Sequence, residues 1–70
     1  MSNELNQLIN EIAGVVYENS DKADSKEVIF NEYYDQVITN DYSCLMGFLW
    51  KNHRKYYYKL KKQIKEELAI

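Results

Sequence analysis

The chain has 70 residues, a formal net charge of −2, and 46% hydrophobic and 29% charged residues, which is the composition of a folded protein rather than a disordered one. A chain this short buries enough surface for one core, so residues 1–70 are expected to form a single domain, and most enzyme architectures are excluded by size. No apolar run approaches the roughly 18 residues that span a bilayer, and the N-terminus lacks the basic and apolar regions of a signal peptide, so we expect a cytoplasmic protein.

The first predicted helix covers about residues 3–18. Its apolar side chains recur at helical spacing and define one face: Leu5, Leu8, Ile9, Ile12 and Val16. Three glutamates repeat every seven residues along one flank: Glu4, Glu11 and Glu18. This flank is either a solvated edge or an acidic ridge that docks a basic partner.

The polar segment "ENSDKADS", residues 18–25, interrupts this pattern and predicts a loop. Asp24 followed by Glu27 resembles a capping box, and a second helix of about residues 25–39 is predicted to start there. The apolar face of this helix is formed by Phe30, Tyr33, Tyr34 and Val37. The aromatic and β-branched residues of this segment also suit a strand, which is the alternative.

After a turn at "TNDYS", a long third helix is predicted over about residues 41–68. One continuous seam runs along it: Leu45, Leu49, His53, Tyr56 or Tyr57, Leu60, Ile64 and Leu68. The alternative is a break near "WKNH", residues 50–53, that folds the last segment back onto the others. Taken together, the pattern predicts an all-α domain of three helices with a long C-terminal helix.

A second face of this long helix carries cations. Because each residue turns the helix by about 100°, this face points away from the seam. We call it the outward basic face; it consists of Lys51, Arg54, Lys55, Tyr58, Lys62 and Lys65. Residues 1–50 hold nine acids and two bases, a net −7, whereas residues 51–65 hold seven bases and no acid, and two terminal glutamates bring the total to −2. The outward basic face is therefore the predicted contact surface for a protein partner or for phosphate groups.

The predicted lengths leave part of the seam uncovered. A helix over residues 41–68 is about 42 Å long, whereas each preceding helix reaches only about 23 Å. The far end of the seam, formed by Tyr57, Leu60, Ile64 and Leu68, would then lack a partner within the chain. A small domain without disulfides or metals often gains stability by oligomerisation, so we predict a homodimer through these residues.

Catalytic chemistry finds little support in the sequence. Cys44 and His53, the only thiol and imidazole, would lie on opposite sides of one helix and about 13 Å apart along its axis. The lone cysteine also excludes an internal disulfide. No HExxH, CxxC, EF-hand or glycine-rich phosphate-loop spacing occurs, so we expect no metal and no cofactor.

These observations predict a small non-enzymatic helical protein that binds and modulates a protein target, as inhibitors, antitoxins and adaptors do. Seven tyrosines in 70 residues favour this interpretation, because tyrosine is enriched at interface cores. The alternative is a nucleic-acid-binding protein that uses the outward basic face, although its net charge is acidic where a basic domain is expected. No membrane partner is expected, because the basic helix would have to detach from its bundle. Lysine outnumbers arginine eight to one, a bias we associate with AT-rich bacterial or phage genomes.

Two glycines lie away from the predicted apolar faces. Gly14 is opposite the first apolar face, and Gly47 lies one turn before Lys51 on the outward side. A glycine inside an exposed helix costs roughly 0.5 to 1 kcal/mol relative to alanine. Each is either a tolerated defect or a place where a partner approaches closely.

Overall fold

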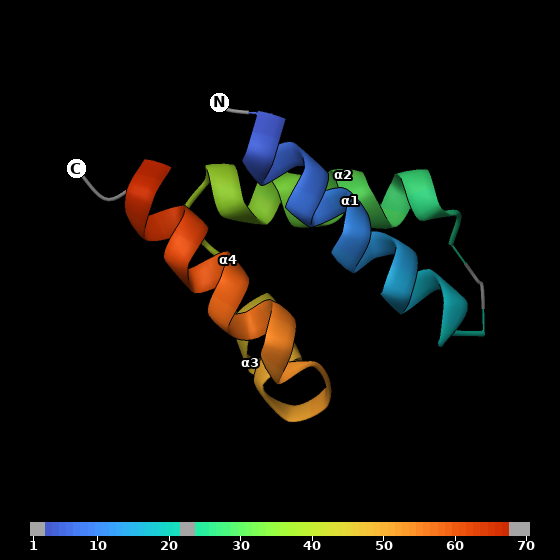
Figure 1. Cartoon of the computed structure of the whole chain (residues 1–70). Coiled ribbons are helices and arrows are strands. Elements are labelled where there is room, and N and C mark those ends of the chain that lie inside the picture. The colour runs from blue at the N-terminus through green and yellow to red at the C-terminus, as the bar shows by residue number, and fades with distance from the viewer. Residues whose placement is uncertain (1–2, 22–23, 68–70) are drawn as a thin grey trace.

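The chain folds into helices joined by short loops (Figure 1). A computed structural model describes residues 3–21 and 24–67, and within those ranges it contains four helices and no strand. The helices are α1 (Asn3–Glu18), α2 (Lys26–Ile38), α3 (Ser43–Asn52) and α4 (Arg54–Glu67). The all-α prediction is confirmed. The prediction of three helices is wrong, because the expected long third helix is two separate helices.

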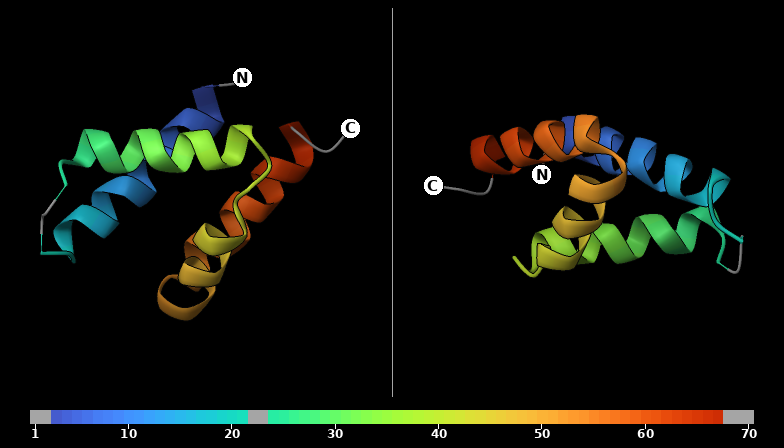
Figure 2. Two further views of the ribbon diagram at one scale, coloured as in Figure 1. Left: turned by 180° about the vertical axis from the view of Figure 1, so that it is seen from behind. Right: turned by 90° about the horizontal axis from the view of Figure 1, so that it is seen from below.

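The helix α1 lies at the centre of the fold and packs against both α2 and α4. Its strong amphipathic pattern places five side chains inside: Leu5, Leu8, Ile9, Ile12 and Ala13. Figure 2 shows α1 crossing α2, and its right-hand view shows α1 and α4 in one layer, α2 in the other, and α3 running from one layer to the other. A single core lies between these layers and receives side chains from all four helices.

The helix α2 begins at Lys26 because Ser25 caps it. The Ser25 hydroxyl oxygen accepts a hydrogen bond of 3.2 Å from the backbone N–H of Val28, which satisfies one of the free donors at the helix start. The predicted capping box of Asp24 and Glu27 is therefore wrong by one residue. The strand alternative for this segment is also wrong.

The end of α2 is fixed by a Schellman motif at Asn40. This residue has a φ of 61°, the left-handed conformation that asparagine tolerates better than most residues. The N–H of Asn40 donates to the Val37 carbonyl at 3.2 Å, and that of Asp41 donates to the Gln36 carbonyl at 2.9 Å. These bonds satisfy the last carbonyls of α2 and turn the chain towards α3.

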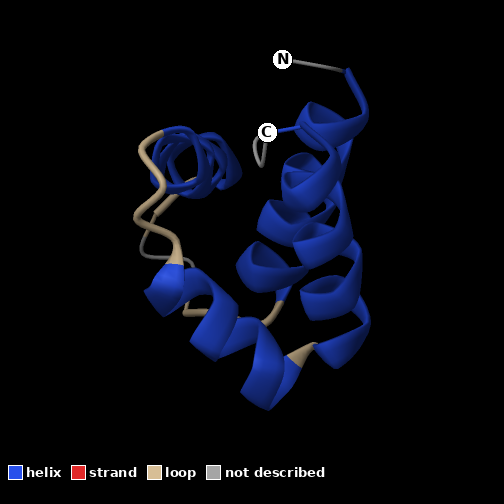
Figure 3. Ribbon diagram, turned by 90° about the vertical axis from the view of Figure 1, so that its left-hand side faces the viewer, coloured by secondary structure: helices blue, strands red, loops and turns tan. Residues whose placement is uncertain are grey.

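The break between α3 and α4 lies at His53, whose φ of −147° and ψ of 64° are not helical. The carbonyls at the end of α3 nevertheless keep partners: the N–H of His53 donates to Leu49 at 2.7 Å, and the side chain of Asn52 donates to Phe48 at 3.1 Å. The His53 carbonyl in turn accepts from backbone N–H groups in the first turn of α4. Few backbone hydrogen bonds are therefore lost at the break. The connection between α3 and α4 is correspondingly short (Figure 3).

Folding back at His53 brings α4 against α1 and α3. Leu60 and Ile64 are only 0% and 5% exposed and join Leu45 and Leu49 in the common core. The prediction that they lack a partner within the chain is therefore wrong. The physical reason is burial: each large apolar side chain removed from water contributes roughly 1.5 to 3 kcal/mol, which an uninterrupted helix would have forfeited.

This burial changes the basis of the predicted homodimer. Of the four residues assigned to self-association, Leu60 and Ile64 are buried within the chain and Tyr57 is half-buried at the edge of the core. Leu68 lies outside the described residues. The uncovered seam is thus no longer an argument for a dimer, and self-association remains a prediction without that support.

Candidate functional site

The outward basic face is divided by the break at His53. All six of its residues are exposed, but Lys51 belongs to α3, whereas the other five lie on α4: Arg54, Lys55, Tyr58, Lys62 and Lys65. On α4 these five stay on the side opposite the buried Leu60 and Ile64, since they follow the break and keep their helical spacing. The outward basic face is therefore a property of α4, with Lys51 separated from it by a turn of the chain.

A cluster of aromatic rings spans the corner where α3 meets α4. The Trp50 ring lies 5.0 Å from the Tyr57 ring and 6.1 Å from the Tyr58 ring, both in edge-to-face geometry. Tyr57 and Tyr58 also contact each other, at 5.2 Å between centroids. Although packed together, Trp50 and Tyr58 remain 42% and 57% exposed. We call this cluster and Arg54 the α3–α4 corner.

Arg54 is held in place at the corner by two interactions. Its Nε donates a hydrogen bond of 3.1 Å to the Trp50 carbonyl at the end of α3. Its guanidinium carbon lies 4.2 Å from the centroid of the Trp50 ring, within the range of a cation–π contact. One exposed positive charge is thus fixed on one exposed aromatic ring.

Beside Trp50 the surface is hollowed by a depression of about 340 Å³, lined by Met46, Gly47, Trp50 and Tyr57. A Cβ atom placed on Gly47 would have no neighbouring atom within 4 Å, so the depression is open space above this glycine. Lys61 reaches the far wall, where its Nζ lies 5.8 Å from the Tyr57 ring centroid. The depression therefore has apolar walls and a cation against each of its two aromatic rings.

The two glycines differ in their surroundings. At Gly14 an added Cβ would lie 3.4 Å from Cε of Lys26, an ordinary van der Waals contact with a lysine side chain of α2. Gly47 has no such neighbour. A Cβ at Gly14 would thus contact a side chain of the fold, whereas at Gly47 it would lie in open space.

The opposite side of the break also combines rings and cations. The His53 ring lies 5.7 Å from Phe48 and 6.4 Å from Tyr56. Two lysines, Lys55 and Lys59, place their ammonium groups 5.8 and 5.7 Å from the Tyr56 ring centroid. Cations and aromatic rings are therefore interleaved along the first half of α4, where the charges lie over apolar surface rather than being fully dispersed in water.

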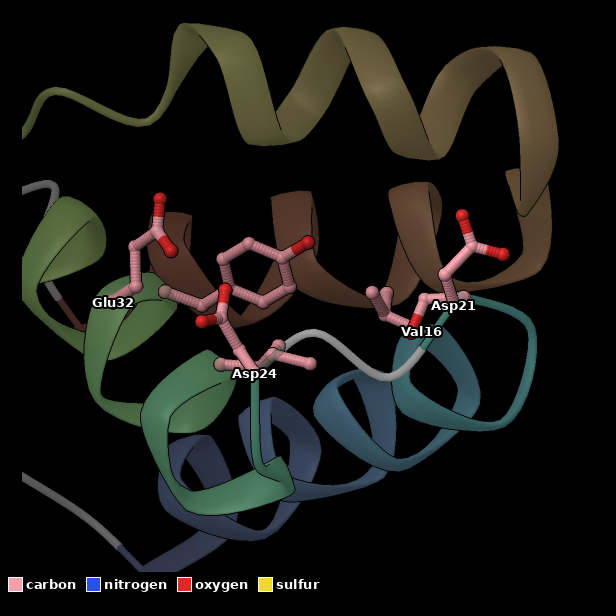
Figure 4. Close-up of a pocket in the computed structure, with 7 residues that line it drawn as sticks. Val16, Asp21, Asp24 and Glu32 are labelled. Carbon is pink, nitrogen blue, oxygen red and sulfur yellow. The ribbon is translucent and has the colours of Figure 1, made fainter.

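A second hollow, also about 340 Å³, lies at the start of α2 and is acidic (Figure 4). Its rim carries the carboxylates of Asp21, Asp24 and Glu32, and its lining includes Val16, Ser20, Ile29 and Tyr33. Burial, with a smaller contribution from the charge of Glu32, raises the pKa of Tyr33 above its ordinary value of 10.0. This hollow and the α3–α4 corner give the molecule two surfaces of opposite charge.

The structure does not bring Cys44 and His53 together. Cys44 is exposed near the start of α3, and His53 caps the end of the same helix, about 13 Å further along the axis. Among the described residues, no group of three histidine, cysteine or acidic side chains is arranged to hold a metal ion. None of the helices in the described part of the chain is long and apolar enough to cross a membrane.

Trp50 is the site residue that sequence reasoning missed. On a single long helix the Trp50 ring could not contact the rings of Tyr57 and Tyr58, because they would lie roughly two turns away along the axis. The break at His53 folds the two helices together and puts these rings in contact. The signal available in the sequence was the alternative break at "WKNH", which places Trp50 just before a helical hairpin.

Comparison with protein families, with curated proteins and with solved structures finds no match for this chain. The α3–α4 corner is therefore the feature of the molecule that bears on its function.

Proposed function

We propose that this chain is a small non-enzymatic protein that binds and modulates another protein through the α3–α4 corner, in the manner of an inhibitor, antitoxin or adaptor. The observation that carries the proposal is the exposed group of Trp50, Tyr58 and Arg54, in which Tyr58 and Arg54 both contact the Trp50 ring. Tryptophan, tyrosine and arginine are the residue types that most often dominate binding energy at protein interfaces.

The corner is also well prepared for binding. Its two helices are anchored by Leu49 and Leu60, which are fully buried in the core. The Arg54 side chain is already fixed by its hydrogen bond and its ring contact. Because ordering a long side chain costs roughly 0.5 to 1.5 kcal/mol on binding, a surface that is ordered beforehand retains more of its contact energy.

A second candidate function is nucleic-acid binding through the outward basic face of α4. It is favoured by Arg54, Lys55, Lys62 and Lys65, which lie on one exposed side of a single helix with Tyr58 among them. Lysine and arginine side chains in such a row neutralise successive phosphates. The net charge of −2 and the acidic hollow at the start of α2 count against it, because both repel a polyanion.

The test is capture from a lysate of the source organism by the immobilised chain. We expect a protein to be retained after nuclease treatment, and to be lost with Trp50→Ala and with the double reversal Lys55→Glu, Lys62→Glu. Lys26→Glu, a charge reversal on α2 far along the chain from the corner, serves as the control and should capture normally. Retention of nucleic acid alone, or protein capture unaffected by Trp50→Ala in the corner and by the double reversal on the adjoining outward basic face, would overturn the proposal.

A further inference from the structure

The depression beside Trp50 is an apolar recess that the fold itself does not fill. Its lining residues are Met46, Gly47, Trp50 and Tyr57, and each aromatic wall carries a cation: Arg54 on Trp50 and Lys61 on Tyr57. We propose that this depression receives an apolar anchor residue of an acidic protein segment, whose carboxylates pair with Arg54 and Lys61. The inference rests on the proposed function and specifies the chemistry of its partner.

The size and lining of the depression suit a side chain. Its volume of about 340 Å³ lies at the lower end of the range for ligand pockets, roughly 300 to 1,000 Å³. No side chain of its lining carries a charge at neutral pH, since the cations lie against the rings that form its walls. An apolar residue flanked by acidic ones matches this pattern of apolar lining and cationic border.

Gly47 supports the same conclusion, because nothing within the fold accounts for it. Its backbone is helical, without the positive φ that would require glycine, and a side chain there would meet empty space. At Gly14, by contrast, an added Cβ would contact the Lys26 side chain. An incoming side chain from a partner gives Gly47 a corresponding role, since any residue larger than glycine would begin to fill the depression.

A nucleic acid fits this recess less well than an acidic segment does. Single strands are held by bases that stack on open aromatic faces. Arg54 already covers one face of Trp50, and Tyr57 and Tyr58 pack against the same ring in edge-to-face geometry. A short segment with a few carboxylates also meets less repulsion from the acidic half of the chain than a continuous polyphosphate does.

The experiment is a selection of short random peptides on the immobilised full chain, followed by titration of the synthesised peptides. Trp50 is the only tryptophan of the chain, so its fluorescence reports occupancy of the corner directly. We expect the selected peptides to carry aspartate or glutamate around one large apolar residue. Replacing those acids by asparagine and glutamine, or the apolar residue by alanine, should weaken binding at least about tenfold, and added salt should weaken it further.

Two glycine variants locate the binding site. Gly47→Leu fills the depression and should weaken peptide binding at least about tenfold, with Gly47→Ala intermediate. Gly14→Ala makes the same gain in helix propensity on α1 and should bind like the unaltered chain. Circular dichroism of each variant establishes that the helices are retained.

Several outcomes would overturn the inference: selected peptides that are neutral or basic, no selected peptide at all, unchanged binding by Gly47→Leu, or a change in Trp50 fluorescence with oligothymidylate but not with peptides. If lysate capture still depends on Trp50 while any of these occurs, the proposed function stands and the acidic partner is wrong. If capture is independent of the corner, the proposed function itself fails.

Discussion

The burial of Leu60 predicts a large loss of stability for Leu60→Ala. This side chain is 0% exposed and lies in the core formed by all four helices. Truncating a fully buried leucine to alanine costs about 2 to 5 kcal/mol, through lost burial and the cavity left behind. A core of this size rarely supplies more than about 3 to 5 kcal/mol, so the variant should keep little of the stability of the domain.

The assay is urea denaturation followed by circular dichroism and by Trp50 fluorescence, at one protein concentration for all variants. Lys62→Ala, at an exposed position two residues along the same helix, is the matched control and should change the free energy of unfolding by less than about 0.5 kcal/mol. A loss as small as this for Leu60→Ala would place Leu60 in solvent or between subunits, as an uninterrupted helix requires. A lower mass of that variant in sedimentation would then support the seam dimer and refute the fold-back at His53.

Three further predictions concern other parts of the fold. Gly47→Ala should raise the free energy of unfolding by about 0.5 to 1 kcal/mol in the same denaturation assay, because the new methyl group meets open space; a loss would contradict this. Asn40→Ala should lower the free energy of unfolding by about 1 kcal/mol, whereas Asn40→Gly should not, because glycine adopts the left-handed conformation without cost. Equal denaturation midpoints for the two variants would argue against the left-handed turn. Because the pKa of Tyr33 is raised, the folded state holds the phenol proton of Tyr33 more tightly than the unfolded state does. The contribution of this proton to the free energy of unfolding is therefore present below pH 10 and is lost as the pH rises through the folded pKa. The difference in tyrosinate absorbance between the chain and Tyr33→Phe should titrate above pH 10.0, and a midpoint at or below that value would refute the assignment.

The parts of the fold that depend on local pattern could be predicted, and those that depend on tertiary packing could not. The apolar spacing of Leu5, Ile9 and Ile12 defines the buried face of α1 whatever surrounds it. The break at His53 agrees with the alternative given for "WKNH", but no residue type there requires it, because "KNHR" contains neither proline nor glycine and the helical pattern continues through it. It is favoured only by the burial of Leu60 against α1 and α3, which a single helix pattern does not reveal.

The same distinction applies to the site. The angular spacing from Arg54 to Lys65 survives the break, so the basic side of α4 could be recognised in the sequence. Lys51 shares this basic side only if residues 41–68 form one continuous helix, and the structure places it on α3 instead. The contact between Trp50 and Tyr57 arises from residues on either side of the break, and it therefore becomes visible only when the two helices are folded together.

Arg54 makes two contacts with Trp50 at the α3–α4 corner, one with its ring and one with its carbonyl. The same guanidinium that lies on the Trp50 ring also holds the Trp50 carbonyl, one of the free acceptors at the end of α3. A partner that moves this side chain away from the ring would therefore also remove the hydrogen bond to the Trp50 carbonyl, so the binding surface and the end of α3 depend on one side chain.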